Sequence, residues 1–528
     1  MPIFPSQNPN RSTPTILLGG EYQCRDLLKS VLGFGRAVAR TYTLHVANDM
    51  FSDGTTAAAS AHIIGWDNAS DNWVYNETNW KKIDNVLDLS RQYGVKLIIP
   101  IINQDFGTPE TDFNGNFNDL TRHRFNITDY RLANTKVDWF TDPEMIRIFK
   151  KLISFFLNRI NTVNGIRYGD DDTILAFETG NEMNWGDPAL RRLVRPAAAN
   201  WTLTIAKHLK SLAHKTLVMD GSFSRTPNNA WEEDVLKSEY VDLFSYHFYG
   251  EGDIDLHDML NQKVRSYNKT LVIGEHGFYR KPDTFTKAYS QFTCAGALLW
   301  SLRPHSENGG FETNSEGHNI YSYHVPGWEV QTSKMFDTQE AQAVQSTYNA
   351  SYQVLGLEPP LRPVPGPPEL FFLTNGTQVG LSWRGSAWAA YYEVFGATFK
   401  NSKFELVCRS VEDNVEAGKL FVPLDPKVPT KSLNVTRGKA KAAESHQGWV
   451  DQKWSYAQSE RSSIAVPSGG EKQENNTPLY TTLSPNDNTN PQGLVEGGWY
   501  FVRGISADGI AGQASQAVFL QKDWKTLI

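Results

Sequence analysis

Short apolar runs rich in β-branched residues alternate with longer amphipathic stretches from about residue 15 to residue 301. Buried parallel strands have the first pattern, and helices that cover a sheet have the second. The pattern predicts eight strands, at Ile16–Leu18, Ala37–Tyr42, Lys96–Ile102, Ile174–Thr179, Leu217–Gly221, Leu243–His247, Leu271–Glu275 and Ala297–Ser301, with helices such as Trp80–Tyr93, Pro143–Ile160, Leu190–Ala213 and Asp255–Tyr267 between them. Eight βα units of this total length are typical of an α/β fold of the (β/α)8 TIM barrel type.

A second pattern begins after a proline-rich stretch. Residues 356–369, GLEPPLRPVPGPPE, favour extended backbone and predict a linker between a barrel at residues 1–355 and a second domain at residues 370–528. The segments QVGLSWRG, AYYEVFGA, GGWYFVRGIS and AVFLQ then alternate polar and apolar positions between glycines. They predict an all-β sandwich of the immunoglobulin or fibronectin III type, with a long polar insertion at about residues 427–490.

Composition narrows the class of protein. A chain of 528 residues exceeds what one hydrophobic core organises, so at least two domains are expected. The net charge of -7 and the lack of a long basic run argue against nucleic acid as a partner. The chain has no stretch of about 18 consecutive apolar residues, which a helix would need to span a bilayer. The chain has three cysteines far apart in sequence, and this spacing indicates neither a disulfide framework nor a zinc site. We expect a monomer without cofactor or metal.

Asparagine usage bears on the compartment. Ten Asn-x-Ser/Thr sequons suit a glycosylated, secreted protein, and we therefore expect an extracellular location. The N-terminal residues MPIFPSQNPNRS show no charged segment followed by an apolar one, so no secretion signal is visible in this chain.

The residues that close each predicted strand carry the candidate chemistry, because the active site of a TIM barrel lies at the carboxyl ends of its strands. The fourth strand ends in ETGNEMNW, which places Asn181 and Glu182 there, and the seventh ends in IGEHG, which places Glu275 there. Cleavage of a glycosidic bond needs two carboxyl groups, one to protonate the leaving oxygen and one to attack carbon or activate water. Glu182 and Glu275 can supply both groups.

Four residues at three further strand ends suit supporting roles. They are Arg40, His247, Tyr249 and Trp300. We expect Arg40 and Tyr249 to keep Glu275 ionised, His247 to line the site, and Trp300 to form the floor under a sugar ring. Glu178 is expected to pair with an arginine instead of acting as the acid. If Glu275 attacks carbon, its carboxyl should lie about 5 to 5.5 Å from that of Glu182.

In this order along the strands, the residues resemble those of the retaining glycoside hydrolases that include family 5 cellulases and β-mannanases. The resemblance covers about residues 15–350 and implies that Glu182 is the acid/base, Glu275 the nucleophile and Asn181 a ligand of the sugar 2-hydroxyl. Arg40, His247, Tyr249 and Trp300 match the supporting residues of that family. The segments GVKLIIPIIN, DDTILAFETGNE and HFYG are most similar to the endo-β-1,4-mannanase branch.

The implied activity is hydrolysis of a β-linked polysaccharide or oligosaccharide, with a mannan endo-1,4-β-mannosidase first among the candidates. A cellulase or other β-glycanase and an exo-β-mannosidase of the same clan stay open, because loops decide the substrate. A non-catalytic carbohydrate-binding protein is the alternative from another class.

Overall fold

The computed structural model describes residues 20–35, 37–51, 56–104, 112, 114–183, 197–224, 227–279, 281, 283–307, 309–312, 315–316, 319–320, 322–327, 340–375, 378–411, 422–424 and 498–519. The chain forms two compact units. One comprises residues 1–302 with 314–322, and the other comprises residues 303–313 with 323–528. The boundary predicted at residue 355 stays a prediction.

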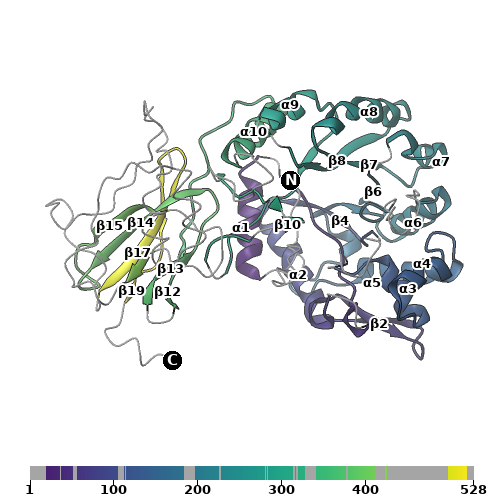
Figure 1. Cartoon of the computed structure of the whole chain (residues 1–528), viewed down its shortest axis with the longest axis horizontal. Coiled ribbons are helices and arrows are strands. Elements are labelled where there is room, and N and C mark those ends of the chain that lie inside the picture. Colours follow the sequence, from purple (N-terminus) through teal and green to yellow (C-terminus); the bar gives the residue numbers. More distant parts are fainter. Residues whose placement is uncertain are drawn as a thin grey trace. The chain divides into compact units, whose positions relative to one another are not determined.

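The first unit is built on a nearly closed, all-parallel sheet (Figure 1). Its described strands pair in the order β1-β4-β5-β6-β7-β8-β9, which is their order along the chain. They are β1 (Val38–Arg40), β4 (Lys96–Pro100), β5 (Ile174–Glu178), β6 (Leu217–Ser224), β7 (Leu243–Tyr249), β8 (Thr270–Gly277) and β9 (Ala297–Leu299). These seven strands confirm seven of the eight predicted ones, and the strand expected at residues 16–18 lies outside the described residues.

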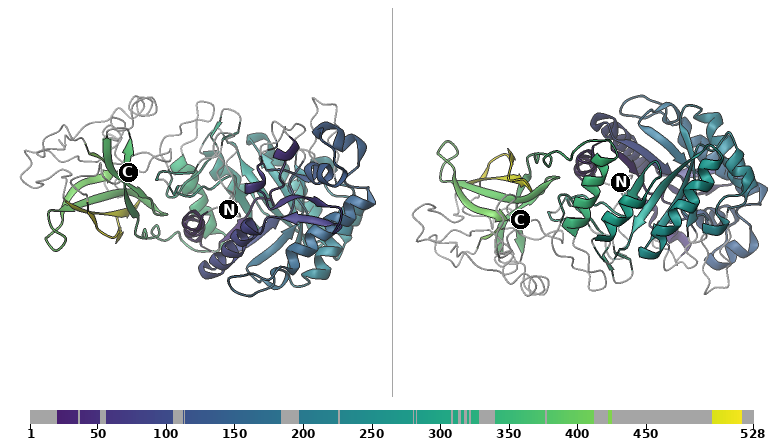
Figure 2. Two further views of the ribbon diagram at one scale, coloured as in Figure 1. Left: turned by 90° about the horizontal axis from the view of Figure 1, so that it is seen from below. Right: turned by 90° about the horizontal axis from the view of Figure 1, so that it is seen from above.

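Helices lie around the outside of these strands (Figure 2). They are α1 (Glu21–Leu32), α2 (Glu77–Tyr93), α3 (Phe117–Phe125), α4 (Tyr130–Lys136), α5 (Pro143–Asn158), α6 (Ala199–Leu212), α7 (Glu233–Lys237), α8 (His257–Ser266) and α9 (Asp283–Gln291). Short 3-10 turns occupy Asp49–Phe51, Ala58–Ser60, Tyr168–Asp170, Pro227–Asn229 and Glu251–Leu256. The four predicted helices are confirmed in α2, α5, α6 and α8. The predicted start of the third, at residue 190, lies outside the described residues.

Helix α5 shows how the sequence specifies such an element. The Asp142 side chain accepts hydrogen bonds from the first turn, and Pro143 stands where a missing N–H costs nothing. Apolar residues at three- and four-residue spacing then form its buried face, at Met145, Ile148, Phe149, Leu152, Ile153, Phe156 and Leu157. The hydrophobic face and the cap together explain why the prediction succeeded here.

An apolar layer supports the sheet from within. Ile98, Ala176, Met219, Val272 and Leu298 come one from each of five strands and form one buried cluster. These residues precede the polar strand ends, so the carboxyl ends rest on a packed floor. An antiparallel hairpin, β2 (Ile63–Asp67) with β3 (Asn72–Tyr75), and a small one, β10 (Ser315–Glu316) with β11 (Asn319–Ile320), complete this unit.

The second unit contains helix α10 (Glu340–Gln353) and two antiparallel sheets. One sheet has the order β12-β13-β16, and the other has the order β15-β14-β17-β18 with β19 also paired to β17. The strands are β12 (Glu369–Asn375), β13 (Gln378–Arg384), β14 (Ala389–Ala397), β15 (Glu405–Val411), β16 (Val422–Leu424), β17 (Trp499–Ser506), β18 (Ala511–Ala514) and β19 (Val518–Phe519). The predicted all-β character is confirmed for these residues, and the insertion at 427–490 lies outside the described ones.

Within the described parts of the chain, no helix combines the length and the apolar character that crossing a membrane requires.

Candidate active site

All seven candidate residues stand at the carboxyl ends of the parallel strands, as the sequence predicted. Arg40 ends β1, His247 and Tyr249 lie in β7, and Glu275 lies in β8. Asn181 and Glu182 lie in the turn that follows Glu178, the last residue of β5. Trp300 directly follows β9. Hydrogen bonds and ion pairs join six of them into one cluster, namely Arg40, Asn181, Glu182, His247, Tyr249 and Glu275. Trp300 packs edge-on against Tyr42, with ring centroids 6.0 Å apart.

Arg40 is the cationic centre of this cluster. Its guanidinium is fully buried and donates to both carboxylate oxygens of Glu178, at 2.6 and 2.8 Å. It also donates to Glu275 Oε1 at 2.7 Å and to Asn181 Oδ1 at 2.8 Å. Burial alone would lower the pKa of Arg40, but the two carboxylates raise it above its ordinary value. A permanently charged, planar donor therefore orients three side chains from two other strands.

Glu275 is buried and accepts two strong donors. Arg40 bonds to Oε1, and the Tyr249 hydroxyl donates to Oε2. Burial raises the pKa of Glu275 above its ordinary range, while His247, Arg40 and the Tyr249 hydroxyl pull it down and Glu182 adds to the rise. Arg40 and Tyr249 thus act in the expected direction. The net shift is nevertheless upward, because removing the carboxylate from water outweighs them, and the ionised state of Glu275 stays a prediction.

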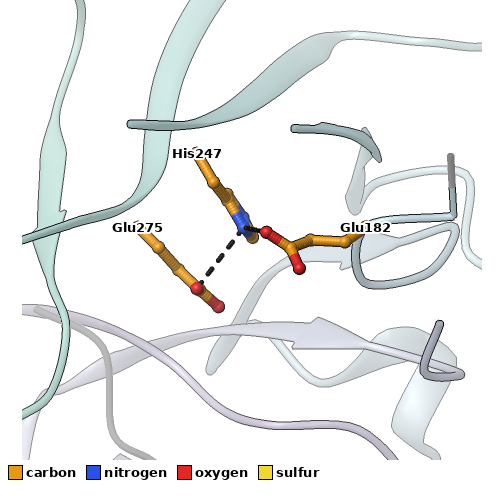
Figure 3. Close-up of side chains that lie close together, drawn as sticks. All are labelled: Glu182, His247 and Glu275. Carbon is orange, nitrogen blue, oxygen red and sulfur yellow. Dashed lines mark hydrogen bonds and ion pairs between the residues drawn. The ribbon is translucent and has the colours of Figure 1, made fainter. Parts of the chain in front are cut away.

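His247 lies between the two candidate carboxylates (Figure 3). Its Nδ1 is 2.8 Å from Glu182 Oε1 and 3.4 Å from Glu275 Oε2. One oxygen of each glutamate and one nitrogen of His247 all lie within 4.8 Å of one another. Two carboxyl groups therefore face a common space, and a single imidazole contacts both.

The backbone at these strand ends is specialised. Glu182 has φ +49°, a conformation that a non-glycine residue rarely adopts, and its N–H donates to the carbonyl of Gly221 at 2.9 Å. A Cβ at Gly221 would lie 1.6 Å from Glu178 Oε1, and one at Gly274 would lie 2.2 Å from Ser245 Oγ and 2.8 Å from His247 Nε2. Glycine at these two positions leaves the space that the polar cluster occupies.

Sequence reasoning missed two members of the network. Asn103 accepts from the Asn181 amide at 2.9 Å and donates to the Tyr42 hydroxyl at 3.0 Å. Asn103 closely follows β4 and Tyr42 closely follows β1, so the search of strand ends that found the others also applied to them. Glu178 was expected to be an arginine's partner, and its paired bonds with Arg40 confirm this.

The three side chains of Figure 3 also have the donor types of a metal site, since each offers one ligand atom to a common point. Acid, base and nucleophile chemistry would use the same atoms, so a cation here would compete with that chemistry.

The chain is similar to the glycoside hydrolase family 5 β-mannosidases. A family model described as "GH family 5 beta-mannosidase-like" matches residues 69–283, less than half of the chain. The match contains Glu182, His247 and Glu275 and does not reach Arg40 or Trp300.

Named relatives point in the same direction. The chain is 32% identical over 276 residues to mannan endo-1,4-beta-mannosidase 7 of Arabidopsis thaliana. This match covers 43% of the chain and 61% of the Arabidopsis protein. It is 28% identical over 189 residues to mannan endo-1,4-beta-mannosidase 1 of Oryza sativa subsp. japonica. This second match covers 35% of the chain and 37% of the rice protein. The chain therefore spans less than two thirds of either relative.

Among solved structures, the endo-1,4-beta-mannanase from Rhizomucor miehei matches with a TM-score of 0.47 and 17% identity. The match covers 64% of this chain and 92% of that one.

Proposed function

We propose that this chain is a retaining glycoside hydrolase that cleaves β-linked polysaccharide, with mannan as its first candidate substrate and endo-1,4-β-mannosidase as its activity. The observation that carries the proposal is the pair Glu182 and Glu275 at the carboxyl ends of β5 and β8 of one parallel sheet, with an oxygen of each within 4.8 Å of the other. Similarity to plant mannan endo-1,4-beta-mannosidases supports the choice of substrate.

The spacing of the two carboxyl groups favours retention. Retaining enzymes hold them about 5 to 5.5 Å apart, whereas inverting enzymes leave room for a water molecule at about 6.5 to 9.5 Å. An oxygen of Glu182 lies within 4.8 Å of an oxygen of Glu275, which supports the first arrangement.

The contacts divide the labour between the two groups. Glu275 is fixed by Arg40 and Tyr249 and would attack the anomeric carbon, forming a covalent glycosyl-enzyme. Glu182, which is less buried and contacts His247, would protonate the leaving oxygen and then activate water. Asn181 would bind the sugar 2-hydroxyl, and Trp300 would support the sugar ring.

The direct test is incubation with mannan, glucomannan and cellulose, followed by sizing of the products and proton NMR of the first anomer released. Internal cleavage of mannan with a β-anomer as initial product is the expected result. Mannose alone from chain ends would indicate an exo-β-mannosidase, and preference for cellulose would indicate a cellulase or other β-glycanase. Binding of a polysaccharide without any product would favour a non-catalytic carbohydrate-binding protein.

Three expectations accompany this proposal. The barrel would have eight strands, the second unit would be a sandwich of the immunoglobulin or fibronectin III type, and the protein would act outside the cell as a monomer. The ten sequons support the extracellular location.

A further inference from the structure

The chain turns sharply just after the candidate nucleophile. Gly277, the last residue of β8, has φ +155°, and Phe278 has φ +59°. This left-handed conformation is sterically unfavourable for a bulky aromatic residue, because its Cβ comes too close to a backbone carbonyl oxygen. Such a strained conformation persists only when interactions with the surrounding structure offset its cost, so the contacts of Phe278 indicate what the turn does.

The turn lays the Phe278 ring on Tyr249. The two rings stack with centroids 4.3 Å apart and planes 24° from parallel. Tyr249 and Gly277 form the last paired position between β7 and β8, and Gly250 N–H closes the strand ends by donating to Gly277 O at 3.0 Å. The left-handed turn is therefore what brings the next side chain back over Tyr249.

Tyr249 is the residue whose hydroxyl donates to Glu275 Oε2. A tyrosine ring has two rotatable side-chain bonds, so the hydroxyl keeps its position only if the ring is held. Its backbone N–H donates to Asp253 Oδ2 at 3.1 Å, which fixes the main chain and leaves the ring to its packing.

We propose that Phe278 is a positioning residue, whose ring, set by the left-handed turn, keeps the Tyr249 hydroxyl on the Glu275 carboxylate. The inference deepens the proposed function, since it rests on Glu275 being the nucleophile. The alternative is that the partly buried Phe278 ring binds a sugar directly, which would affect substrate binding and leave the pKa of Glu275 unchanged.

Titration of Glu275 separates these two readings. The groups that face its carboxylate are Arg40 from β1, Glu182 after β5, and His247 and Tyr249 from β7. The Tyr249 hydrogen bond lowers the pKa of Glu275, because it stabilises the charged form. Loss of that bond should therefore raise the pKa further.

The experiment uses the full chain with carbon-13 in the glutamate side-chain carboxyls, and the Glu275 signal is assigned by its loss in Glu275→Gln. Phe278→Asn removes the ring and keeps a residue that tolerates positive φ, so the turn is preserved. Phe278→Tyr keeps a ring and should titrate like the wild type. Phe125→Ala, at the exposed end of α3, controls for the loss of an aromatic ring elsewhere.

We expect Tyr249→Phe and Phe278→Asn each to raise the pKa of Glu275, and the double variant to raise it no further than Tyr249→Phe does. A wild-type titration in Phe278→Asn would overturn the proposal, and so would equal titration of Tyr249→Phe and wild type. Because the signal needs no turnover, it decides the role of Phe278 even if the wild type hydrolyses none of the polysaccharides, which would refute the proposed function alone.

Kinetics supply the second readout. Removing a donor that stabilises an active-site charge typically costs about 10²- to 10³-fold, and Phe278→Asn should lower kcat by at least about tenfold. The loss should be absent when Phe278→Asn is added to Tyr249→Phe. A raised KM with unchanged kcat, additive with Tyr249→Phe, would show that the ring binds sugar and would overturn the positioning role.

Discussion

At the scale of single residues, the site is organised by one buried cation. Arg40 donates to Glu178, Glu275 and Asn181, so two carboxylates share its charge. Glu178 accepts from Nε and Nη2 of Arg40, whereas Glu275 accepts from Nη1. The absence of a side chain at Gly221 leaves room for the Glu178 carboxylate. Arg40, Glu178 and Glu275 thus each have a partner of opposite charge, which is the condition for keeping ionised groups in a barrel interior.

Different roles for Glu182 and Glu275 predict different consequences of removing each. Glu275→Ala should abolish turnover, because no covalent intermediate can form. Glu182→Ala should lose roughly 10² to 10⁴-fold on polysaccharide and spare the first step with an activated aryl glycoside, whose leaving group needs no proton. The intermediate should accumulate, and azide should restore turnover with a β-configured glycosyl azide as product.

Product analysis by NMR checks this assignment. An α-azide from Glu275→Ala together with no rescue of Glu182→Ala would exchange the two roles. Full activity in both variants would show that the chemistry lies elsewhere.

At the scale of elements, irregular strand pairing shapes the site. The pairing of β7 with β8 shifts register between Tyr246 and His247, and Gly274 is the residue passed over on β8. Because Gly274 has no side chain, Ser245 Oγ and His247 Nε2 can occupy the space that a Cβ would fill. Such irregularities redirect side chains near active sites. Here the shift and the glycine together let His247 lie between both glutamates.

Gly274→Ala should therefore displace the His247 ring and lower kcat/KM by roughly 10- to 100-fold, since a small misplacement of catalytic groups costs this much. The Ser245 hydroxyl can rotate away, but the imidazole is rigid, so adding Ser245→Ala should restore little. Gly296→Ala is the matched control, because a Cβ there meets no atom within 4 Å. Steady-state kinetics of the three variants measure the effect, and a wild-type rate in Gly274→Ala would refute it.

At the scale of the whole molecule, the barrel carries a buried acid that the proposed chemistry does not use. Asp220 in β6 is 1% exposed and accepts from the Ser222 N–H at 3.0 Å. Burial raises its pKa to about 6, against the hydrogen bond from the Ser222 N–H, and Glu178 adds to the rise. The folded barrel therefore holds the Asp220 proton more tightly than the unfolded chain does.

The stability of the barrel should consequently fall as pH rises from about 4 to about 6 through this group. Above that window the charged form is buried at a cost of up to roughly 3 kcal/mol. Asp220→Asn keeps an acceptor for Ser222 and should stabilise the barrel at pH 7 relative to wild type, with the advantage disappearing near pH 4. Urea unfolding at both pH values measures this difference, and an equal effect at both would exclude titration of Asp220 as its cause.

The sequence by itself determined the alternation of strands and helices. Each buried strand is an apolar run and each covering helix an amphipathic one, and both patterns are local. Seven parallel strands and the placement of Arg40, Asn181, Glu182, His247, Tyr249, Glu275 and Trp300 at their ends follow from that pattern, because parallel strands of a barrel end at the same face.

The tertiary structure decided which of those residues touch and what that does to their charge. The bonds of Arg40 to Glu178 and Glu275 join positions 138 and 235 residues apart, so no local pattern records them. The raised pKa of Glu275 depends on how far burial outweighs its partners, which only the packed site defines. The stack of Phe278 on Tyr249 and the space above Gly274 likewise arise where two strands meet in three dimensions.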